Sequence, residues 1–284
     1  MENNATVEEK MTLRKLPRNV WAVSLTSFFM DVSSEMVINI LPLFLANVLG
    51  VKTSLIGVIE GVAEATASLL KLFSGWLSDK LGSRKWIAVA GYGISAISKP
   101  FFLLTNTWAS IAGARWADRI GKGVRTAPRD ALVADSIDPK NRGLAFGFQR
   151  AADTAGAMLG LLIAILVVWL VQKNAQTLNL NTFRTVVWIS LIPAVLAVLS
   201  IAIGTKEVAI KGKSVMPKFA FRSLGRPFMV FMVIVSIFDL GNSSDAFLVL
   251  RAQERSISVI GILAMLAAFN LVYTLVSLPA GSLS

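Results

Sequence analysis

Apolar runs of about membrane-spanning length recur along this 284-residue chain and constrain its fold more than any other feature. A helix rises 1.5 Å per residue, so about 20 mainly apolar residues cross the hydrocarbon core of a bilayer. Helices are expected because lipid offers no partner for open backbone groups, and the alternation typical of barrel strands is absent. The sequence therefore predicts an all-α, polytopic membrane protein with spans at residues 20–48, 54–77, 86–105, 107–134, 143–171, 184–204, 228–249 and 257–284.

The composition agrees with this class and excludes others. Charged residues make up 16% of the chain, against about 25% in soluble domains, and hydrophobic residues make up 55%. Because the chain has no cysteine and no histidine, disulfides, thiol chemistry and imidazole chemistry are excluded, and any transferred proton must be carried by carboxyl groups. There is also no phosphate-binding loop or soluble lobe, so we expect no cofactor, no metal site and no enzymatic activity.

Lysine and arginine are distributed unevenly between the two sets of connectors. If the N-terminus is cytoplasmic, 15 cations lie on the cytoplasmic side and five on the other. The first set is Lys10, Arg14, Lys15, Arg18, Lys80, Arg84, Lys85, Lys140, Arg142, Lys206, Lys211, Lys213, Lys218, Arg222 and Arg226, and the second is Lys52, Lys173, Arg184, Arg251 and Arg255. This bias predicts a cytoplasmic N-terminus. We expect a monomeric, multi-pass protein of a bacterial or archaeal cytoplasmic membrane, in contact with lipid.

The net charge of +11 raises the alternative of nucleic-acid binding. The excess cations, however, lie mainly in short connectors and in one charged helix, so no basic soluble face is available for a nucleic acid. We therefore expect no nucleic-acid partner.

Four segments are predicted along the chain. These are a cytoplasmic tail at 1–19, a six-helix bundle at 20–204, a basic cytoplasmic linker at 205–227, and the first two helices of a second bundle at 228–284. An internal repeat supports this division. It pairs VSSEM (32–36) with NSSDA (242–246), SLIG (54–57) with SVIG (258–261), and GWLS (75–78) with GSLS (281–284). Since Ser284 corresponds to Ser78, we expect the chain to be part of a longer protein with a second six-helix half.

A short polar turn, GWLSDKLGSRK at Gly75–Lys85, separates the second and third predicted spans. It resembles the loop between the second and third helices of the major facilitator superfamily of secondary transporters. Gly75, Asp79, Gly82, Arg84 and Lys85 occupy the matching positions. The resemblance implies that this turn acts as a cytoplasmic gate, in which Asp79 pairs with a helix of the second half.

Three further stretches resemble the same superfamily. They are RIGKG at 119–123, ALVADSIDPKNRGLAFG at 131–147, and DTAGAMLG at 153–160, which is similar to the fifth-helix motif of antiporters. The resemblance implies that Arg119 takes part in proton coupling. Lys122 and Arg125 depart from the usual pattern, and the fifth-helix motif lacks its proline. Gly156 and Gly160 are spaced for close helix packing, and a contact that rocks during transport would also use them.

Ionisable residues inside the predicted spans are spaced to share helix faces. Such residues must face partners or an aqueous cavity, because each costs about 2.5–3.5 kcal/mol at the centre of the bilayer. The second span places Glu60, Glu64 and Lys71 on one face, and the first pairs Asp31 with Glu35. The fourth aligns Arg115, Arg119, Lys122 and Arg129, with Asp118 and Arg125 to one side and Asp130, Asp135 and Asp153 as expected counter-ions.

Two interpretations of these charges remain open. In the first, Arg115, Lys122, Arg125 and Lys71 line a cavity that attracts an anionic solute, while Glu60, Glu64, Asp31 or Glu35, with Arg119, carries the proton. In the second, acids and bases cancel in an interhelical network of ion pairs.

The resemblance and the charges together predict a secondary transporter that moves a small solute by alternating access, with protons as the coupled ion. An organic or metabolite anion is the expected solute. The alternative within the superfamily is a proton-driven exporter of drug-like compounds. A channel or a membrane scaffold that transports nothing is the alternative from another class.

Overall fold

The computed structural model describes residues 12–104, 107–173, 175–208, 225–241 and 244–283, and within these ranges it contains helices and no strands. Ten α-helices follow one another within the described ranges. They are α1 (Arg18–Ile38), α2 (Leu41–Asn47), α3 (Thr53–Leu81), α4 (Arg84–Leu104), α5 (Trp108–Asp135), α6 (Arg142–Gln172), α7 (Leu180–Gly204), α8 (Arg226–Gly241), α9 (Asp245–Glu254) and α10 (Val259–Leu283). The all-α prediction is confirmed, and each predicted span ends within five residues of a helix end.

Two predicted spans are each divided into two helices. The first becomes α1 and α2, because Pro42 lies in the first turn of α2 and has no N–H to continue the helix before it. The seventh becomes α8 and α9, and Ser244 caps α9 by accepting a hydrogen bond from the N–H of Ala246. The residues between these two helices, 242–243, lie outside the described ranges.

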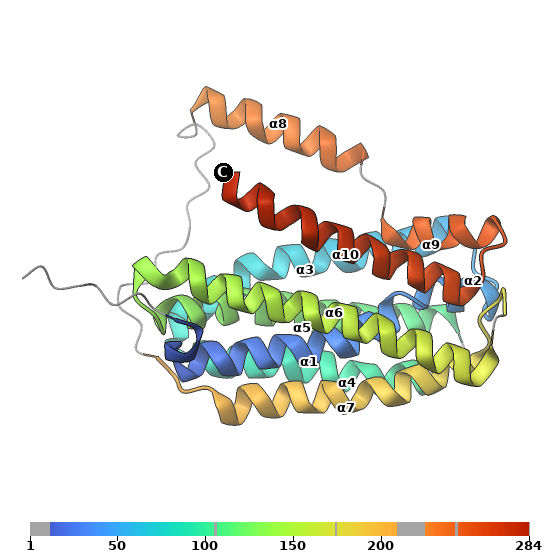
Figure 1. The fold of residues 1–284 in the computed structure, drawn as a ribbon, viewed down its shortest axis with the longest axis horizontal. Coiled ribbons are helices and arrows are strands. Elements are labelled where there is room, and N and C mark those ends of the chain that lie inside the picture. The colour runs from blue at the N-terminus through green and yellow to red at the C-terminus, as the bar shows by residue number, and fades with distance from the viewer. Residues whose placement is uncertain (1–11, 105–106, 174, 209–224, 242–243, 284) are drawn as a thin grey trace, which may run out of the picture.

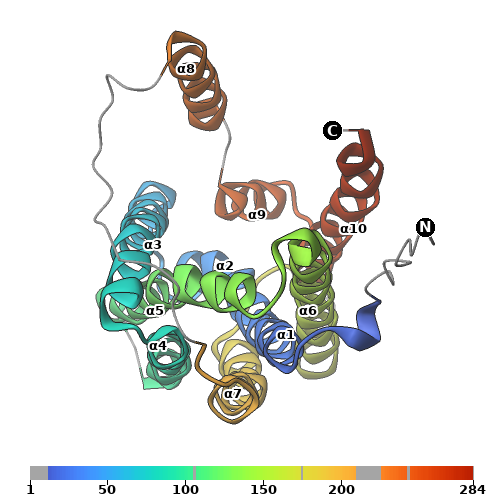
Figure 2. The same cartoon turned by 90° about the vertical axis from the view of Figure 1, so that its left-hand side faces the viewer.

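Six long helices form the main bundle: α1, α3, α4, α5, α6 and α7 (Figure 1). The packed pairs are α4 with α5, α3 with α5, α1 with α6, α1 with α7, and α4 with α7. The view along the bundle shows α3, α5 and α4 on one side and α1, α6 and α7 on the other (Figure 2). α9 and α10 contact α2, α3 and α6, whereas none of the residues of α8 is buried.

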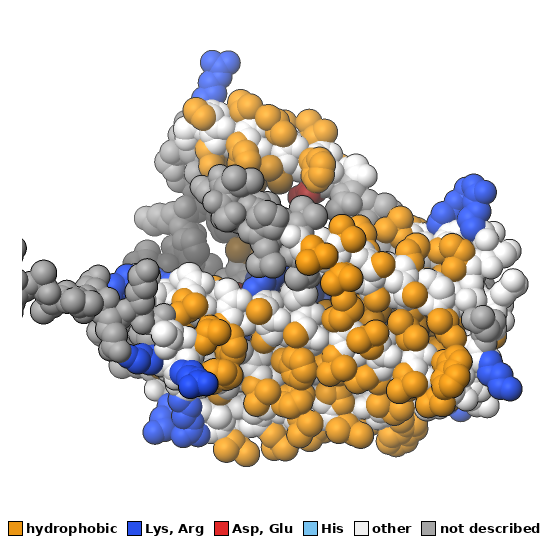
Figure 3. All heavy atoms as spheres, in the orientation of Figure 1, with side chains coloured by type: hydrophobic (Ala, Val, Ile, Leu, Met, Phe, Trp, Pro, Cys, Tyr) orange, Lys and Arg blue, Asp and Glu red, His pale blue; other side chains and the backbone are white. Residues whose placement is uncertain are grey.

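Five helical segments of the described chain are long and apolar enough to cross a membrane: Arg18–Asn47, Arg84–Leu104, Pro139–Gln172, Leu180–Gly204 and Arg226–Glu254. α3 and α5 are not among them, although both lie lengthwise in the bundle (Figure 1). Their ionisable residues lower their mean hydropathy. The face of the bundle seen in Figure 3 carries a broad apolar surface, with lysine and arginine side chains gathered toward its ends.

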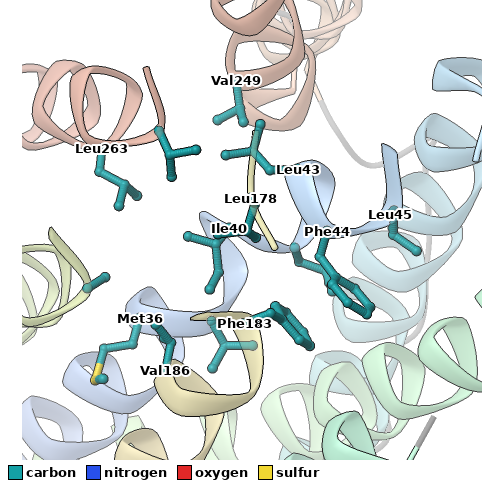
Figure 4. Close-up of a cluster of buried hydrophobic side chains, with 14 of the residues drawn as sticks. Met36, Ile40, Leu43, Phe44, Leu45, Leu178, Phe183, Val186, Val249 and Leu263 are labelled. Carbon is teal, nitrogen blue, oxygen red and sulfur yellow. The ribbon is translucent and has the colours of Figure 1, made fainter. Parts of the chain in front are cut away.

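The largest apolar cluster lies at the end of the bundle where α2 packs. Phe44 of α2 stacks on Phe183 of α7, with ring centroids 3.8 Å apart. Met36, Ile40, Val249 and Leu263 bring α1, α9 and α10 into the same cluster (Figure 4). α9 and α10 are therefore joined to the bundle at this end.

The repeated sequences occupy partly equivalent places. SLIG lies in the first turns of α3, and SVIG lies where α10 begins. VSSEM, however, lies within α1, whereas NSSDA spans the junction of α8 and α9, and its Asn242 and Ser243 are outside the described residues. Ser284, the last residue of GSLS, is also outside them. The assignment of α8–α10 to a second bundle stays a prediction.

Candidate functional site

A cavity of about 540 Å³ opens between α1, α3, α5, α8 and α9. Most of the side chains around it are polar or charged. Its lining comprises Glu35, Ile38, Asn39 and Pro42 from the α1–α2 segment, Glu60 and Glu64 from α3, Arg115, Arg119 and Lys122 from α5, and Asp239, Ser244, Asp245, Ala246 and Val249 from α8 and α9. Among the described residues, five acids and three bases therefore line the cavity.

Arg115 and Glu60 form a buried ion pair at the wall of this cavity. The Arg115 Nη2 donates to Glu60 Oε2 at 2.6 Å, and its Nε donates to both carboxylate oxygens at 3.1 and 3.2 Å. The two side chains are 3% and 10% exposed. A guanidinium group that engages a carboxylate through two nitrogens is the strongest and most directional form of this contact.

A second ion pair lies one helical turn away. The Arg119 Nη1 donates to Glu64 Oε1 at 3.0 Å, and its Nη2 donates to Asp118 Oδ2 at 2.9 Å. The Glu64 side chain is 52% exposed, so this pair is open to the cavity. Asp118 is buried and also lies 3.7 Å from Arg115. It therefore interacts with both arginines.

The structure brings most of the predicted site residues together, but it pairs them differently. The counter-ions of Arg115 and Arg119 are Glu60, Glu64 and Asp118. The expected counter-ions Asp130, Asp135 and Asp153 are therefore not the acids that the structure pairs with these two arginines. Asp130 pairs with Arg129 and Asp135 with Arg84. The cause is the axial register of α3 against α5, which sequence spacing within one helix does not encode.

Two predicted cavity residues lie elsewhere. Arg125 is buried between α4 and α5, over the ring of Tyr92 at 4.7 Å, where it donates to the hydroxyl of Ser95. Lys71 lies about three turns beyond Glu60 on α3 and does not line the cavity. Among the predicted proton carriers, Glu35 lines the cavity and accepts a hydrogen bond from Asn39, whereas Asp31 does not line it.

Lys99 and Asp118 lie beside the site in positions that the spacing of residues in the sequence did not predict. Lys99, on α4, is 3% exposed, and its Nζ donates to the Ser34 hydroxyl of α1 at 3.3 Å. It also interacts electrostatically with Asp118. A lone lysine within an apolar span was the available signal for Lys99, because burying an unpaired ammonium group in lipid is costly.

The Gly75–Lys85 segment lies at the end of the bundle opposite α2 and is mostly helical: it comprises the end of α3, the connecting residues Gly82 and Ser83, and the start of α4. Gly82 adopts φ = 66°, a left-handed conformation that glycine tolerates best and that ends α3. Arg84 pairs with Asp79, in the last helical turn of α3, at 3.1 Å and with Asp135, at the end of α5, at 2.8 Å. Gly75 packs against Ala127 of α5. In this structure, Asp79 thus has a partner within its own bundle.

Glu207, which follows α7, was not identified from the sequence. Its Oε1 accepts hydrogen bonds from the backbone N–H of Arg84 at 2.8 Å and of Lys85 at 3.2 Å. The Lys85 Nζ in turn donates to the carbonyl oxygen of Thr205. Glu207 therefore satisfies free N–H groups at the start of α4. These contacts hold the segment that follows α7 against the start of α4.

Gly156 and Gly160 lie where α6 approaches α1 most closely. A Cβ at Gly156 would meet the carbonyl oxygen of Phe28, and one at Gly160 would lie 2.6 Å from the carbonyl oxygen of Val32. Real Cβ atoms do not approach backbone oxygens so closely. Both positions therefore require glycine for this helix contact.

A bundle of apolar helices around a charged central cavity defines a class of membrane protein rather than a soluble enzyme fold. The chain belongs to the Major Facilitator Superfamily, whose family model matches residues 23–284. It is 33% identical over 277 residues to the uncharacterized MFS-type transporter MJ1317 of Methanocaldococcus jannaschii, covering 95% of this chain and 67% of that one. It is 29% identical over 132 residues to the multidrug resistance protein MdtH of Cronobacter sakazakii, covering 44% of this chain and 30% of that one.

Solved structures support the fold. A peptide transporter POT in complex with alafosfalin matches with a TM-score of 0.59 at 15% identity, covering 84% of this chain and 50% of that one. The human organic anion transporter MFSD10 matches with a TM-score of 0.55 at 20% identity, covering 72% and 51%. The chain thus spans about half the length of these transporters. It is an integral, multi-pass membrane protein of a transporter family.

Proposed function

We propose that this chain provides half or more of the solute pathway of a secondary active transporter that couples the movement of a small charged solute to protons. The observation that carries the proposal is the pairing of cavity arginines with cavity glutamates. Each of these contacts is an ion pair only while its glutamate is ionised. Glutamate protonation and solute binding can therefore be linked at the same guanidinium groups.

Glu64 is the better placed of the two glutamates to exchange a proton. Its side chain is half exposed to the cavity, whereas that of Glu60 is 10% exposed. When Glu64 binds a proton, the Arg119 Nη1 loses its charged acceptor and becomes free to bind an anionic group of a solute. A proton and an anion would then enter the cavity together and leave it together, which is symport by alternating access.

A second candidate is proton-driven export of cationic, drug-like compounds. Glu35, Asp239 and Asp245 line the cavity in addition to the two paired glutamates, so acids outnumber bases there. Multidrug resistance proteins are among the similar sequences. In this candidate a cation competes with a proton for the acids, and the two move in opposite directions.

Transport by the protein in liposomes with an imposed pH gradient tests both candidates. A panel of labelled anionic and cationic solutes is compared with the gradient in either direction. We expect saturable uptake driven by the gradient, with anions following protons in symport and cations moving against them in export. Non-saturating flux, or no flux with any solute, would favour the channel or scaffold alternative.

The Glu64→Gln variant tests the coupling residue. The variant should lose uptake driven by the pH gradient while it retains exchange of labelled for unlabelled solute, because the amide cannot release a proton. Glu254→Gln is a matched control, since Glu254 is 56% exposed and pairs with Arg251 on α9, away from the cavity lining. If Glu64→Gln keeps the pH dependence of the unmodified protein, Glu64 is not the coupling residue.

A further inference from the structure

An apolar groove of about 530 Å³ lies where α1 meets α6 and the end of α7. It shares no residue with the charged cavity, and its lining contains no residue of α8, α9 or α10. α8 and α9 lie on the opposite side of the bundle from α7 (Figure 2). Among the described residues that line the groove, Arg18 alone is charged. The proposed solute pathway uses none of them.

The groove has aromatic walls and small residues between them. The ring of Trp21 packs edge-on against that of Phe148, with centroids 4.5 Å apart. Ala152 of α6 and Gly204 of α7 fill little of the space beside these rings. Trp21 and Leu25 are 46% and 47% exposed, so the groove opens outward from the bundle. In a membrane-spanning bundle, an apolar slot of this kind faces the acyl chains of lipids.

The length of the groove matches the depth of one leaflet. Its lining follows α1 from Arg18, the first residue of the helix, to Phe28. A helix advances about 15 Å over these ten residue steps, which is half of the roughly 30 Å hydrocarbon core of a bilayer. Trp21 lies near the start, at the level where tryptophan rings prefer the membrane interface. One acyl chain of a lipid in the predicted cytoplasmic leaflet therefore fits along the groove.

Arg18 is fixed at the mouth of the groove. Its Nε donates to the carbonyl oxygen of Gly204 at 2.9 Å, and its Nη2 donates to that of Ile203 at 3.0 Å. Among the described residues, no carboxylate pairs with Arg18. Because a guanidinium group has five N–H donors, it can bind a phosphate group while it keeps both contacts to α7.

Further cations lie at this end of the bundle. Arg14 is exposed in the 3-10 turn just before α1. Asn19 exchanges two hydrogen bonds with the backbone of Lys206, at 2.8 and 2.9 Å, which holds this lysine beside the start of α1. The carboxylate of Glu207 is directed instead to the N–H groups that begin α4. The mouth is therefore positively charged and complements an anionic headgroup, the kind that the cytoplasmic leaflet carries.

Ser24 is a second sign of a ligand. It lines the groove, is 2% exposed, and its Oγ has no hydrogen-bond partner among the described residues. Thr26 on the same helix donates instead to the carbonyl oxygen of Ala22 at 2.7 Å. Buried hydroxyl groups are nearly always hydrogen-bonded. A ligand with acceptor oxygens as well as an apolar chain would satisfy Ser24, whereas a pure hydrocarbon would not.

We propose that this groove is a binding site for one anionic phospholipid of the cytoplasmic leaflet, with its phosphate on Arg18 and one acyl chain along α1 as far as Phe28. The lipid contacts α1, α6 and α7 together. Its phosphate binds the same guanidinium group that holds the end of α7, so the bound lipid joins these three helices at this end of the bundle. The site is separate from the solute cavity and does not depend on the proposed transport.

Native mass spectrometry of the purified full chain tests the headgroup contact. The protein in detergent is mixed with equal amounts of phosphatidylglycerol and phosphatidylethanolamine that carry the same acyl chains. We expect the first lipid retained to be phosphatidylglycerol. Arg18→Gln should weaken its binding about fivefold, the effect of one arginine at an anionic membrane surface.

Arg142→Gln is the matched control for Arg18→Gln. Arg142 is exposed at the same end of the bundle and also donates to a backbone carbonyl oxygen, that of Ala134, but it does not line the groove. This variant should bind phosphatidylglycerol as the unmodified protein does. Equal retention of the two lipids by the unmodified protein, or equal losses in Arg18→Gln and Arg142→Gln, would overturn the site.

A photoreactive phosphatidylglycerol, with a diazirine in the middle of one acyl chain, tests the apolar part. Peptide mapping should find the label on α1 near Leu25 and Phe28. Ala152→Leu, which fills the groove, should remove most of this label, and Ala151→Leu, on an exposed position of the same helix, should not. Label that is unchanged in Ala152→Leu would also overturn the site. Melting temperatures check folding, and if one variant fails to fold, the other decides.

Discussion

Arg115 shows how strongly a single residue of the site depends on its partner. It is nearly buried, and it contacts Glu60 through two nitrogens. Burying such a pair costs desolvation energy, so the pair adds little net stability. Breaking it is different, since the remaining charge is left without compensation.

Replacing one partner should therefore destabilise the protein more than replacing both. We expect Arg115→Gln to lower the free energy of unfolding by about 3–5 kcal/mol. The double variant Arg115→Gln with Glu60→Gln should recover much of that loss. Thermal denaturation in detergent of the unmodified protein, the two single variants and the double variant measures this double-mutant cycle. Additive effects of the two substitutions would show that the pair is not energetically coupled.

The exposed pair of Arg251 and Glu254 is the matched control. Its atoms are equally close, at 2.6 Å, but the side chains are 64% and 56% exposed. Arg251→Gln should change stability by about 0–1 kcal/mol, because water and salt screen the pair.

Sequence spacing anticipated part of the site and missed the rest for a physical reason. The i, i+4 spacing of Glu60 with Glu64 and of Arg115 with Arg119 predicted which faces turn inward, and the structure brings these faces together. It could not predict which acid meets which base, because that depends on the relative height of two helices. Glu207 lies outside any helix and has no periodic pattern to mark it.

At the scale of elements, α1 and α6 are held together by backbone contact at two glycines. Gly156→Ala should therefore destabilise the protein by about 1–3 kcal/mol, the typical effect of overpacking. Gly147→Ala on the same helix is the control, since a Cβ there meets nothing within 4 Å. That substitution should be neutral or slightly stabilising. Equal effects of the two substitutions on melting temperature would contradict the close contact.

The start of α4 offers a second test at this scale. Glu207→Gln keeps one hydrogen-bond acceptor but removes the charge that faces the N–H groups of Arg84 and Lys85. We expect a loss of about 0.5–2 kcal/mol, as for other helix caps. Glu207→Ala should lose more. Melting temperatures that rank Ala below Gln and Gln below the unmodified protein would agree with this contact, and unchanged values would oppose it.

The helices themselves were predictable because hydropathy reports lipid contact directly. The breaks between consecutive helices were harder to predict. Pro42 explains the break before α2, but a proline does not always end a helix, and a proline lies within α4, α5 and α7. Whether the freed backbone groups are satisfied there depends on neighbouring helices, which the local sequence does not specify.

At the scale of the whole molecule, the predicted sidedness can be tested because the chain has no cysteine. Asp138→Cys and Lys52→Cys place single thiols at exposed sites in connectors at opposite ends of the bundle. A membrane-impermeant thiol reagent applied to intact cells should label Lys52→Cys and not Asp138→Cys. Permeabilised cells should allow both to react. The reverse pattern would place the N-terminus outside the cytoplasm.

α5 is too polar to enter the bilayer on its own hydropathy, and this bears on how the protein is made. Its arginines and lysine would each oppose insertion by about 2.5–3.5 kcal/mol if they met only lipid. α3 leaves the ribosome first and carries Glu60 and Glu64. These acids would already be present at the translocon when α5 emerges, where they would be available to pair with its cations. We therefore expect membrane insertion of α5 to depend on α3, and a defect in either glutamate to appear first as a failure of membrane insertion.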